Sequence, residues 1–531
     1  MNQQNQLYAR LQVTTTVVLL LIILKSFHAQ DADFWNQQAQ DNMKRILAKK
    51  HNTNVAKNVI FFLGDGMGVS TVTAARIYGG QKVNKSGEEH ILSFEAFPEI
   101  GLIKTYNTDL QVPDSAGTGT AFLCGVKSKA GTLGLNDHVI YSNCTSQRGA
   151  EVTSILDWST AEGKSTGIVT TARLTHATPA AAYAHAARRG WEGDTEMPTD
   201  AQTCKDIAYQ LVMENSNIEV LMGGGRRYFL SENKTDPELN YAHRYQRKDL
   251  DLIDEWISEK QRRKVSHRYV WNKKQFQDTD PETTYYLLGL FESSHMQYEY
   301  ARDKSDAGEP SLREMTEKAI QILSKNPKGY FLLVEGGRID HAHHDTRAGR
   351  ALEETVALDE AVTSAASLTN QDDTLIVVTA DHSHVFMMAG YPSRGNNILG
   401  KVDDSEGDDG LPYTTLVYGN GYEQRKNITD IDTTDFGYRQ ESLVPLYSET
   451  HGGEDVAVYA RGPMAHLFVG THEQSYIPHV MAYASCVGVN KQHCSRTPPT
   501  DELTSNLASI RQGDAFLVLV FLCIVNVMHC F

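Results

Sequence analysis

The sequence predicts an α/β protein in which a central, mostly parallel sheet carries helices on both faces. Short, continuous apolar runs that end in glycine or polar turn residues recur along the chain, and segments with helical spacing lie between them. Continuous apolar runs are typical of strands buried on both faces, and their alternation with helices favours a parallel sheet. No repeat and no linker-like segment divides this pattern, so we expect one large domain with insertions.

The predicted elements begin with an amphipathic helix at residues 31–50, where strong helix formers combine with helical spacing. A buried strand at residues 58–63 then ends in the tight turn Gly64-Asp65-Gly66-Met67-Gly68. The same pattern predicts further buried strands at 165–171, 218–222, 330–334 and 375–379, and helices at 310–323 and 348–368.

Two long segments fit the alternation less well. Residues 231–309 are charged and aromatic, and residues 394–450 are rich in Gly, Asp, Asn and Thr. We interpret both as insertions over the face that carries the functional site. Open parallel sheets gather functional groups just beyond the carboxyl ends of their strands, so we expect the chemistry at that edge.

The composition excludes one class of partner. The chain has 531 residues, with 50 Lys and Arg against 66 Asp and Glu, which gives a net charge of −16. Binding to a phosphate backbone requires a basic surface, so we expect no nucleic-acid partner. Hydrophobic residues make up 40% of the chain, which indicates a globular protein with a large core.

The first long apolar run predicts a secretory signal peptide. Residues 17–24 are wholly apolar, follow the single positive charge of Arg10, and precede small Ala29 and polar Gln30. This order is typical of a signal peptide cleaved near Ala29, which would remove residues 1–29. The alternative is an uncleaved anchor, but the run is short for a membrane span.

The second long apolar run, residues 516–525, follows the polar stretch 501–514, which contains small residues. A small-residue attachment site, a polar spacer and a terminal hydrophobic tail form the signal for a glycolipid anchor. We expect attachment at Ser505 or Asn506 and removal of a propeptide at residues 506–531. The protein would then be held at the outer face of the plasma membrane. The alternative is a tail-anchored helix.

The secretory pathway also makes glycosylation and disulfide bonds plausible. N-glycosylation sequons occur at Asn84, Asn143, Asn233 and Asn427.

The chain has seven cysteines, an odd number, and those in the terminal run would leave with it. Cys486 and Cys494 are close in sequence and form a natural local pair, which leaves Cys144 to bond with Cys204. Cys124 lies in an apolar run, where a buried thiol would remain unpaired and inert.

The densest group of possible metal ligands is residues 335–344, Glu-Gly-Gly-Arg-Ile-Asp-His-Ala-His-His, directly after a predicted strand. If this segment turns into a helix, Asp340 and His344 stand at i and i+4 and face the same way. A carboxylate and an imidazole so placed suit zinc, although a surface helix would also explain one such pair. Asp65, the pair Asp381-His382, and His451 add carboxylates and imidazoles at other turns, where a capped turn is the alternative for each alone.

A serine stands at the start of another predicted helix, in Asp114-Ser115-Ala116-Gly117-Thr118. The positive end of a helix favours an anion, so Ser115 is a candidate nucleophile for an anionic substrate. The simpler alternative for an isolated serine here is a helix N-cap.

Taken in order, these motifs resemble those of the alkaline phosphatase family. The nucleophile motif D-S-A-G-T occurs at residues 114–118, V-E-G-G-R-I-D-H-x-H-H at 334–344, T-A-D-H-S-H at 379–384 and H-x-G-E-D-V at 451–456. The resemblance covers roughly residues 40–495 and is strongest to the animal, glycolipid-anchored branch. It implies an alkaline phosphatase catalytic domain over residues 30–505.

The resemblance also implies metal ligands, by position in these motifs. One zinc ion would be held by Asp340, His344 and His451, and a second by Asp381 and His382. Asp65 would bridge from the second zinc ion to a magnesium ion, which Thr178 and Glu335 would complete.

The resemblance also implies a phosphate-binding arginine and a calcium site. Arg189 would clamp the phosphate; Arg188 is an adjacent competitor, but the spacing from Trp191 favours Arg189. A structural calcium ion would be bound by Glu238, the carbonyl of Phe291, Glu292 and Glu309, where Glu309 stands in place of the usual Asp.

The implied activity is hydrolysis of phosphate monoesters through a phosphoserine on Ser115, in a homodimer with the N-terminal helix and residues 394–450 near the two-fold axis. Two alternatives remain. A sulfatase or phosphodiesterase could share the fold, but the C/S-x-P-x-R context of a sulfatase is absent around Ser115. A glycolipid-anchored receptor with a decayed site is the other, although none of the implied ligands is missing.

Overall fold

The computed structural model describes residues 31–198 and 204–495, and the chain divides into two compact units at His51. The N-terminal unit contains the expected helix, α2 (Ala32–Leu47). Asp31 caps it by accepting a hydrogen bond from the Phe34 N–H at 3.0 Å, and Lys44 and Arg45 lie in its last turn, where the helix dipole favours cations. No helix among the described residues is both long and apolar enough to cross a membrane, and both terminal apolar runs lie outside those residues.

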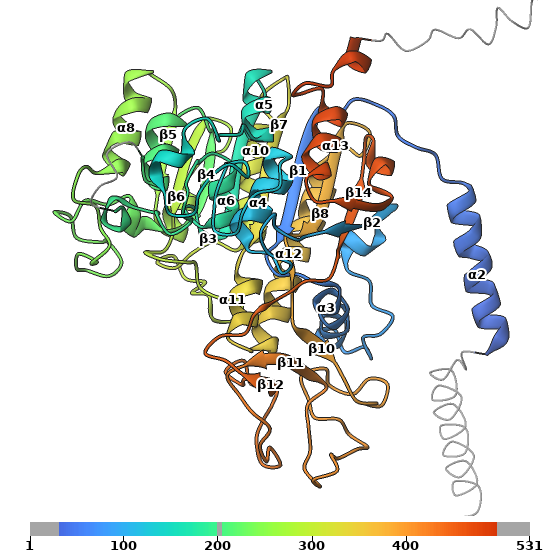
Figure 1. The fold of residues 1–531 in the computed structure, drawn as a ribbon. Coiled ribbons are helices and arrows are strands. Elements are labelled where there is room, and N and C mark those ends of the chain that lie inside the picture. Colours follow the sequence, from blue (N-terminus) through green and yellow to red (C-terminus); the bar gives the residue numbers. More distant parts are fainter. Residues whose placement is uncertain (1–30, 199–203, 496–531) are drawn as a thin grey trace, which may run out of the picture. The chain divides into compact units, whose positions relative to one another are not determined.

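The second unit is built on a ten-stranded sheet (Figure 1). Its strands are parallel except β14, which pairs antiparallel with both neighbours. In spatial order they are β15 (Gly470–Glu473), β2 (Glu99–Lys104), β14 (Val456–Arg461), β8 (Thr374–Ala380), β1 (Asn58–Gly64), β7 (Tyr330–Gly336), β3 (Ser165–Arg173), β4 (Val220–Gly224), β6 (Tyr286–Leu290) and β5 (His267–Val270). The predicted α/β class and the five predicted strands are confirmed.

β1 lies at the centre of the sheet and pairs in parallel with β7 on one side and β8 on the other. The run Val59-Ile60-Phe61-Phe62-Leu63 is buried, as are all residues of β7 and β8. Such strands appear in the sequence as unbroken apolar runs, because helices cover both of their faces. The register brings the ends of these three strands together, with Gly64 opposite Gly336 and Ala380.

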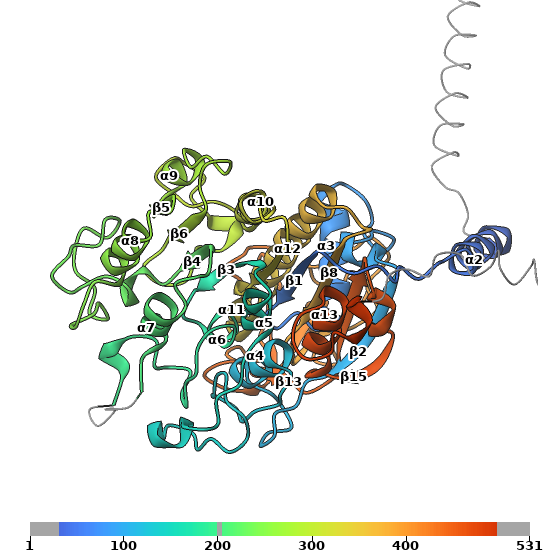
Figure 2. The ribbon, with the colours of Figure 1, turned by 90° about the horizontal axis from the view of Figure 1, so that it is seen from above.

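Helices cover both faces of the sheet (Figure 2). One layer contains α3 (Val69–Lys82), α10 (Leu312–Leu323) and α12 (Ala348–Leu368). The other contains α4 (Ser115–Cys124), α5 (Ile155–Ala161), α6 (Ala177–Ala181) and α13 (Tyr476–Ser485). The helices predicted at 310–323 and 348–368 correspond to α10 and α12.

The two segments interpreted as insertions differ in the structure. Part of residues 231–309 joins the main sheet, because β6 pairs with β4 and β5 pairs with β6. The apolar run of β6 is buried, but charged residues on both sides hide its pattern in the sequence. The helices α8 (Leu252–Arg262) and α9 (Lys273–Gln277) lie in the same segment. Residues 394–450 contribute to a separate small sheet of β10 (Phe386–Met388), β11 (Leu416–Gly421) and β12 (Ser442–Pro445).

Two disulfide bonds are present in the structure, Cys144–Cys204 and Cys486–Cys494. Cys124 lies in α4 as a free, buried thiol. Burial also raises the pKa of this thiol well above its ordinary value, which keeps it in the unreactive protonated form.

Candidate metal centre

Three buried carboxylates meet where the central strands end. Asp65 follows β1, Glu335 is near the end of β7, and Asp381 follows β8, and all three are completely buried. Because β1 lies between β7 and β8 in a parallel arrangement, their carboxyl ends reach the same edge of the sheet.

These carboxylates lack the partners that buried anions need. Neither oxygen of Asp65 accepts a hydrogen bond from a described residue, and Asp381 has one satisfied oxygen, which accepts from the Gly66 N–H at 2.9 Å. Burial, and then the charges of Asp381, Asp340 and Glu335, raise the pKa of Asp65 well above its ordinary value. Burying an anion without a counterion costs free energy, so these carboxylate oxygens fit a site for cations.

His382 lies beside the candidate nucleophile. Its Nε2 is 3.1 Å from Ser115 Oγ, 3.1 Å from Asp381 Oδ2 and 3.6 Å from Asp65 Oδ1. Its Nδ1 lies 3.1 Å from the carbonyl oxygen of Ser383, which assigns the proton to Nδ1 and leaves a lone pair on Nε2. In a Ser-His-Asp triad the carboxylate contacts the nitrogen remote from the serine. Here both contact Nε2, which is the arrangement of ligands around a cation.

Asp340 and His344, one turn apart on α11 (Arg338–His344), meet His451 from β13 (His451–Gly452). The Nδ1 atoms of His344 and His451 lie 2.6 and 2.8 Å from the carbonyl oxygens of Glu449 and Pro113. Their Nε2 atoms are 3.1 Å apart, and each is 3.3 Å from Asp340 Oδ1. Two lone pairs cannot hydrogen-bond to each other, so this geometry also fits a shared metal ion.

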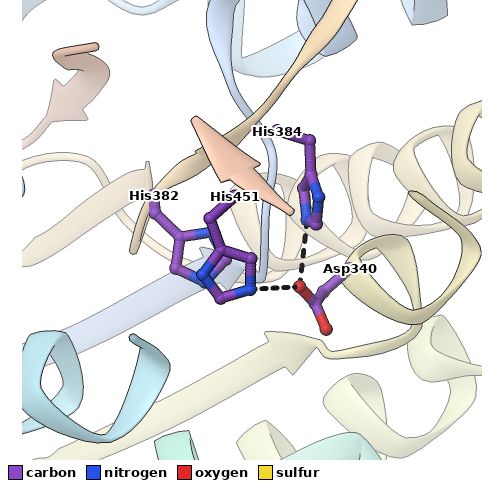
Figure 3. A group of neighbouring side chains, drawn as sticks. All are labelled: Asp340, His382, His384 and His451. Carbon is purple, nitrogen blue, oxygen red and sulfur yellow. Dashed lines mark hydrogen bonds and ion pairs between the residues drawn. The ribbon is translucent and has the colours of Figure 1, made fainter. Parts of the chain in front are cut away.

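His384 and Glu449 also lie in this centre, and neither is among the ligands that the resemblance implies. Figure 3 shows His384 beside His382, His451 and Asp340, and its Nε2 is 2.9 Å from Asp340 Oδ1. Its Nδ1 lies 2.6 Å from Glu449 Oε2. Burial disfavours its charge, but the two carboxylates raise the pKa of His384 to about 10. As an imidazolium it has no lone pair for a metal and instead fixes Asp340.

The motif at residues 379–384 contains His384, two residues after His382, so the sequence places its imidazole near this centre. Its exact partner depends on β9 (Ser383–His384), which pairs with β13 so that His384 stands opposite His451. A ladder of two residues has no sequence pattern, so the contact is visible in the structure alone.

The predicted magnesium ligands also lie together. Ligand atoms of Asp65 and Glu335 fall within 4.8 Å of each other. Burial raises the pKa of Glu335, and the neighbouring hydroxyl groups of Thr170 and Thr178 oppose that shift. Glu335 Oε1 and Thr178 Oγ1 are buried without a hydrogen-bond partner among the described residues. An oxygen-only set of this kind suits magnesium.

Ser115 is the first residue of α4 and is almost completely buried. Asp114 caps the helix by accepting hydrogen bonds from the N–H groups of Ala116 and Gly117 at 3.1 and 3.3 Å. It also holds Arg189, whose Nη1 is 2.5 Å from Asp114 Oδ2. The competing residue Arg188 is exposed, whereas Arg189 contacts Asp114, the residue before the candidate nucleophile Ser115.

The predicted calcium ligands form a separate acidic group. Burial, and then Glu238, raise the pKa of Glu292 to about 7, and burial with Glu292 raises that of Glu309 to about 9. Glu309 Oε2 is buried without a partner among the described residues, while Arg226 contacts Glu238 at 2.5 Å. Phe291 and Glu292 directly follow β6. The group has more negative than positive charge and fits a cation.

The predicted modification sites divide between described and undescribed residues. The side chains of Asn84, Asn143, Asn233 and Asn427 are all exposed, as an attached glycan requires, and their glycosylation stays a prediction. The signal peptide and the anchor residues Ser505 and Asn506 lie outside the described residues.

Known proteins match most of this chain. The family model "Alkaline phosphatase" matches residues 56–487. The tissue-nonspecific isozyme of alkaline phosphatase from Rattus norvegicus is 55% identical over 478 residues, which cover 88% of this chain and 91% of that protein. The Homo sapiens isozyme is 54% identical over 502 residues, covering 92% and 94%, and an alkaline phosphatase from Gadus morhua is 50% identical over 470 residues, covering 86% and 98%.

Solved structures agree on the fold. The alkaline phosphatase from the Antarctic bacterium TAB5 has a TM-score of 0.58 and 24% identity, covering 82% of this chain and 100% of that one. The Thermus thermophilus alkaline phosphatase has a TM-score of 0.60 and 23% identity, covering 84% and 94%. The chain therefore belongs to the alkaline phosphatase family and is a phosphoric monoester hydrolase.

Proposed function

We propose that the chain hydrolyses phosphate monoesters to an alcohol and inorganic phosphate through a phosphoserine on Ser115, with two zinc ions and one magnesium ion. The observation that supports this most directly is the placement of the Ser115 hydroxyl next to His382 and to buried carboxylates that have no partners. Ser115 is therefore surrounded by side chains of the types that ligate cations, and no other histidine or carboxylate of the described chain is placed as a separate general base for it.

The chemistry of the donor atoms favours three metal sites. Asp340, His344 and His451 would hold one zinc ion, and Asp381 and His382 the other. Asp65, Thr178 and Glu335 would hold magnesium, with Asp65 shared between the second and third sites. When bound, such a pair of zinc ions activates an oxygen nucleophile and neutralises charge on the attacking and leaving oxygens of a phosphoryl transfer.

The chain's own groups bind and orient the substrate. The guanidinium of Arg189 can donate two parallel hydrogen bonds to phosphoryl oxygens, and its contact with Asp114 fixes its direction. Ser115 Oγ then attacks phosphorus, the alcohol leaves, and water cleaves the phosphoserine from the opposite side. The N-terminus of α4 adds a positive potential at Ser115 that favours the phosphorylated state.

A fourth cation is proposed outside the catalytic centre. Glu238, Glu292, Glu309 and the carbonyl of Phe291 would bind calcium, a hard ion that takes carboxylate and carbonyl oxygens. Its role would be structural, because it would neutralise an acidic group between β6 and the loop before α10.

We further propose that this enzyme is a precursor with a signal peptide at 1–29, a catalytic domain at 30–505 and a propeptide at 506–531. A glycolipid at Ser505 or Asn506 would hold the homodimer at the outer face of the plasma membrane. Release of activity from membranes by a phosphatidylinositol-specific phospholipase tests the anchor, and retention of activity on the membrane would contradict it.

The test of the catalytic proposal is turnover of p-nitrophenyl phosphate combined with metal analysis of the purified protein. We expect two zinc ions and one magnesium ion per chain, loss of activity on chelation, and recovery when zinc and magnesium are returned. Unchanged turnover after all zinc has been removed would overturn the proposal.

A further inference from the structure

His343 is a histidine of the motif at residues 334–344 that the proposed mechanism does not use. It directly precedes His344 on α11 and is completely buried. Its Nδ1 lies 2.8 Å from the hydroxyl oxygen of Tyr418, and its Nε2 lies 3.0 Å from the hydroxyl oxygen of Thr71. A neutral imidazole has one donor and one acceptor nitrogen, and a hydroxyl group can be the partner of either. Both ring nitrogens are therefore satisfied within the chain, so His343 is not a metal ligand.

The two partners of His343 belong to elements outside α11. Thr71 lies in the first turn of α3, and Tyr418 lies in β11 of the small sheet. Both side chains are buried. Phe386 stands opposite Tyr418 in the antiparallel pair of β10 and β11, and the centroid of its ring is 4.9 Å from that of His343. The His343 ring therefore connects α11 to the small sheet and to α3.

The segment that follows β11 also contacts the C-terminal end of α11. The backbone N–H of Gln440 donates to the carbonyl oxygen of Thr346 at 2.8 Å, and its Oε1 accepts from the Ala348 N–H at 2.8 Å. The Glu449 N–H donates to the carbonyl oxygen of His344 at 3.1 Å. A helix of seven residues leaves most of its own backbone groups without intrahelical partners, so outside contacts of this kind determine where α11 lies.

α11 carries two of the proposed zinc ligands, so its position matters for metal binding. Asp340 and His344 flank His343 on this helix, and Asp340 Oδ1 lies 3.3 Å from His344 Nε2. Zinc requires both atoms at roughly 2.0–2.2 Å from the ion, which leaves little tolerance for a shift of the helix. His384, which contacts Asp340, also packs against His343 with ring centroids 4.7 Å apart. A displaced His343 ring would therefore disturb both ligands and the residue that orients one of them.

We propose that Tyr418 is a positioning residue for the zinc site of Asp340, His344 and His451. Its hydroxyl group fixes the His343 ring, and the ring fixes α11 in the orientation that directs two ligands at one ion. This inference rests on the proposed function, because it requires a zinc ion between these three side chains. It gives the small sheet of β10, β11 and β12 a part in metal binding, although none of the proposed ligands belongs to those strands.

The test measures zinc binding to Tyr418→Phe, which keeps the ring and removes the hydroxyl group. We expect the affinity for one zinc ion per chain to fall about tenfold, in the range usual for groups that orient ligands, while the second zinc ion keeps its affinity. Competition with a chromogenic chelator measures both ions. Turnover of p-nitrophenyl phosphate should fall when zinc is limiting and recover in excess zinc. Thr71→Val removes the other partner of His343 and should weaken the same zinc ion.

A double variant tests whether Tyr418 acts through His343. His343→Leu has no ring nitrogen, so adding Tyr418→Phe to it should cause no further loss of zinc affinity. A further loss of the same size as in the single variant would show that Tyr418 acts by another route, and would overturn the inference.

Tyr183→Phe is the matched control. Tyr183 is also buried, and its hydroxyl group also makes a hydrogen bond of 2.8 Å, but to the carbonyl oxygen of Leu174. This variant should bind zinc like the unmodified protein. Unchanged zinc affinity in Tyr418→Phe, an equal loss for both zinc ions, or the same loss in Tyr183→Phe would overturn the inference, because each would show a role in the core alone. An unmodified protein that binds no zinc would instead contradict the proposed function, and the inference with it.

Discussion

Glu449 serves two histidines of the metal centre at once. Its carboxylate contacts His384 Nδ1, and its backbone carbonyl oxygen accepts from His344 Nδ1, both at 2.6 Å. His384 in turn contacts Asp340, so one residue outside the ligand set orients two ligands. Such outer groups fix ring direction and protonation, and they contribute strongly to metal affinity.

We therefore predict that Glu449→Gln weakens zinc binding about 10–100-fold, because the amide cannot hold His384 as an imidazolium beside Asp340. Zinc competition with a chromogenic chelator measures the effect. Glu441→Gln is the control, since Glu441 is a buried carboxylate of the same segment that contacts Arg425 and Lys426 and no histidine of the centre. Equal zinc affinity in both variants would show that Glu449 has no positioning role.

Arg189 provides a second test at the residue scale. Arg189→Lys should lower kcat/KM for p-nitrophenyl phosphate about 10–100-fold, because an ammonium group cannot offer two parallel donors or keep the same contact with Asp114. Arg188→Lys changes the exposed neighbour and should have no effect. Steady-state kinetics of both variants decide between the two arginines, and a larger loss in Arg188→Lys would reverse the assignment.

At the scale of elements, the packing of α4 on α6 positions Ser115, the proposed nucleophile. A Cβ added at Gly119 would lie 2.9 Å from the Cβ of Ala181 in α6, closer than two carbon atoms can pack. α4 begins at Ser115 and α6 contains Thr178, so the approach of these two helices sets the position of both side chains.

Gly119→Ala should accordingly destabilise the protein by about 1–3 kcal/mol, the usual cost of adding a methyl group to a full core. It should also lower kcat, because Ser115 moves with its helix. Denaturant unfolding and p-nitrophenyl phosphate kinetics measure the two effects. Wild-type stability together with wild-type kcat would show that the helix contact does not position the site.

The elements that reach the centre differ in how well the sequence predicts them. β1, β7 and β8 are evident as apolar runs, and Asp65, Glu335 and Asp381 are expected where those runs end. β5 and β6 lie within the segment that the sequence predicts to be an insertion, because the residues around them are charged. The ladder of β9 with β13 has two residues on each side, too few for any periodicity, and tertiary contacts alone define it.

At the scale of the whole molecule, the acidic group near β6 links stability to pH. In the calcium-free protein the pKa values of Glu292 and Glu309 are raised to about 7 and about 9, whereas in the unfolded chain both are about 4. At any pH between the unfolded pKa and these raised pKa values, the folded state therefore binds more protons than the unfolded state. Its free energy of unfolding must fall as pH rises through the two folded pKa values.

We predict that protein loaded with zinc and magnesium alone melts at a lower temperature near pH 9 than near pH 6. Calcium should raise the melting temperature more at the higher pH, where it need not displace protons. Thermal unfolding at both pH values, with and without calcium, measures this. Glu309→Gln should reduce the pH dependence, and an equal calcium effect at both values would contradict the assignment.

The central claim is that Ser115 becomes phosphorylated during turnover, and it is tested by acid quenching of the reaction followed by mass spectrometry of the peptides. We predict a phosphoryl group on Ser115 in the quenched enzyme, and none in Ser115→Ala, which should lose at least about a thousandfold in kcat while its zinc content stays normal. Turnover without phosphorylated Ser115, or full activity in Ser115→Ala, would contradict the claim.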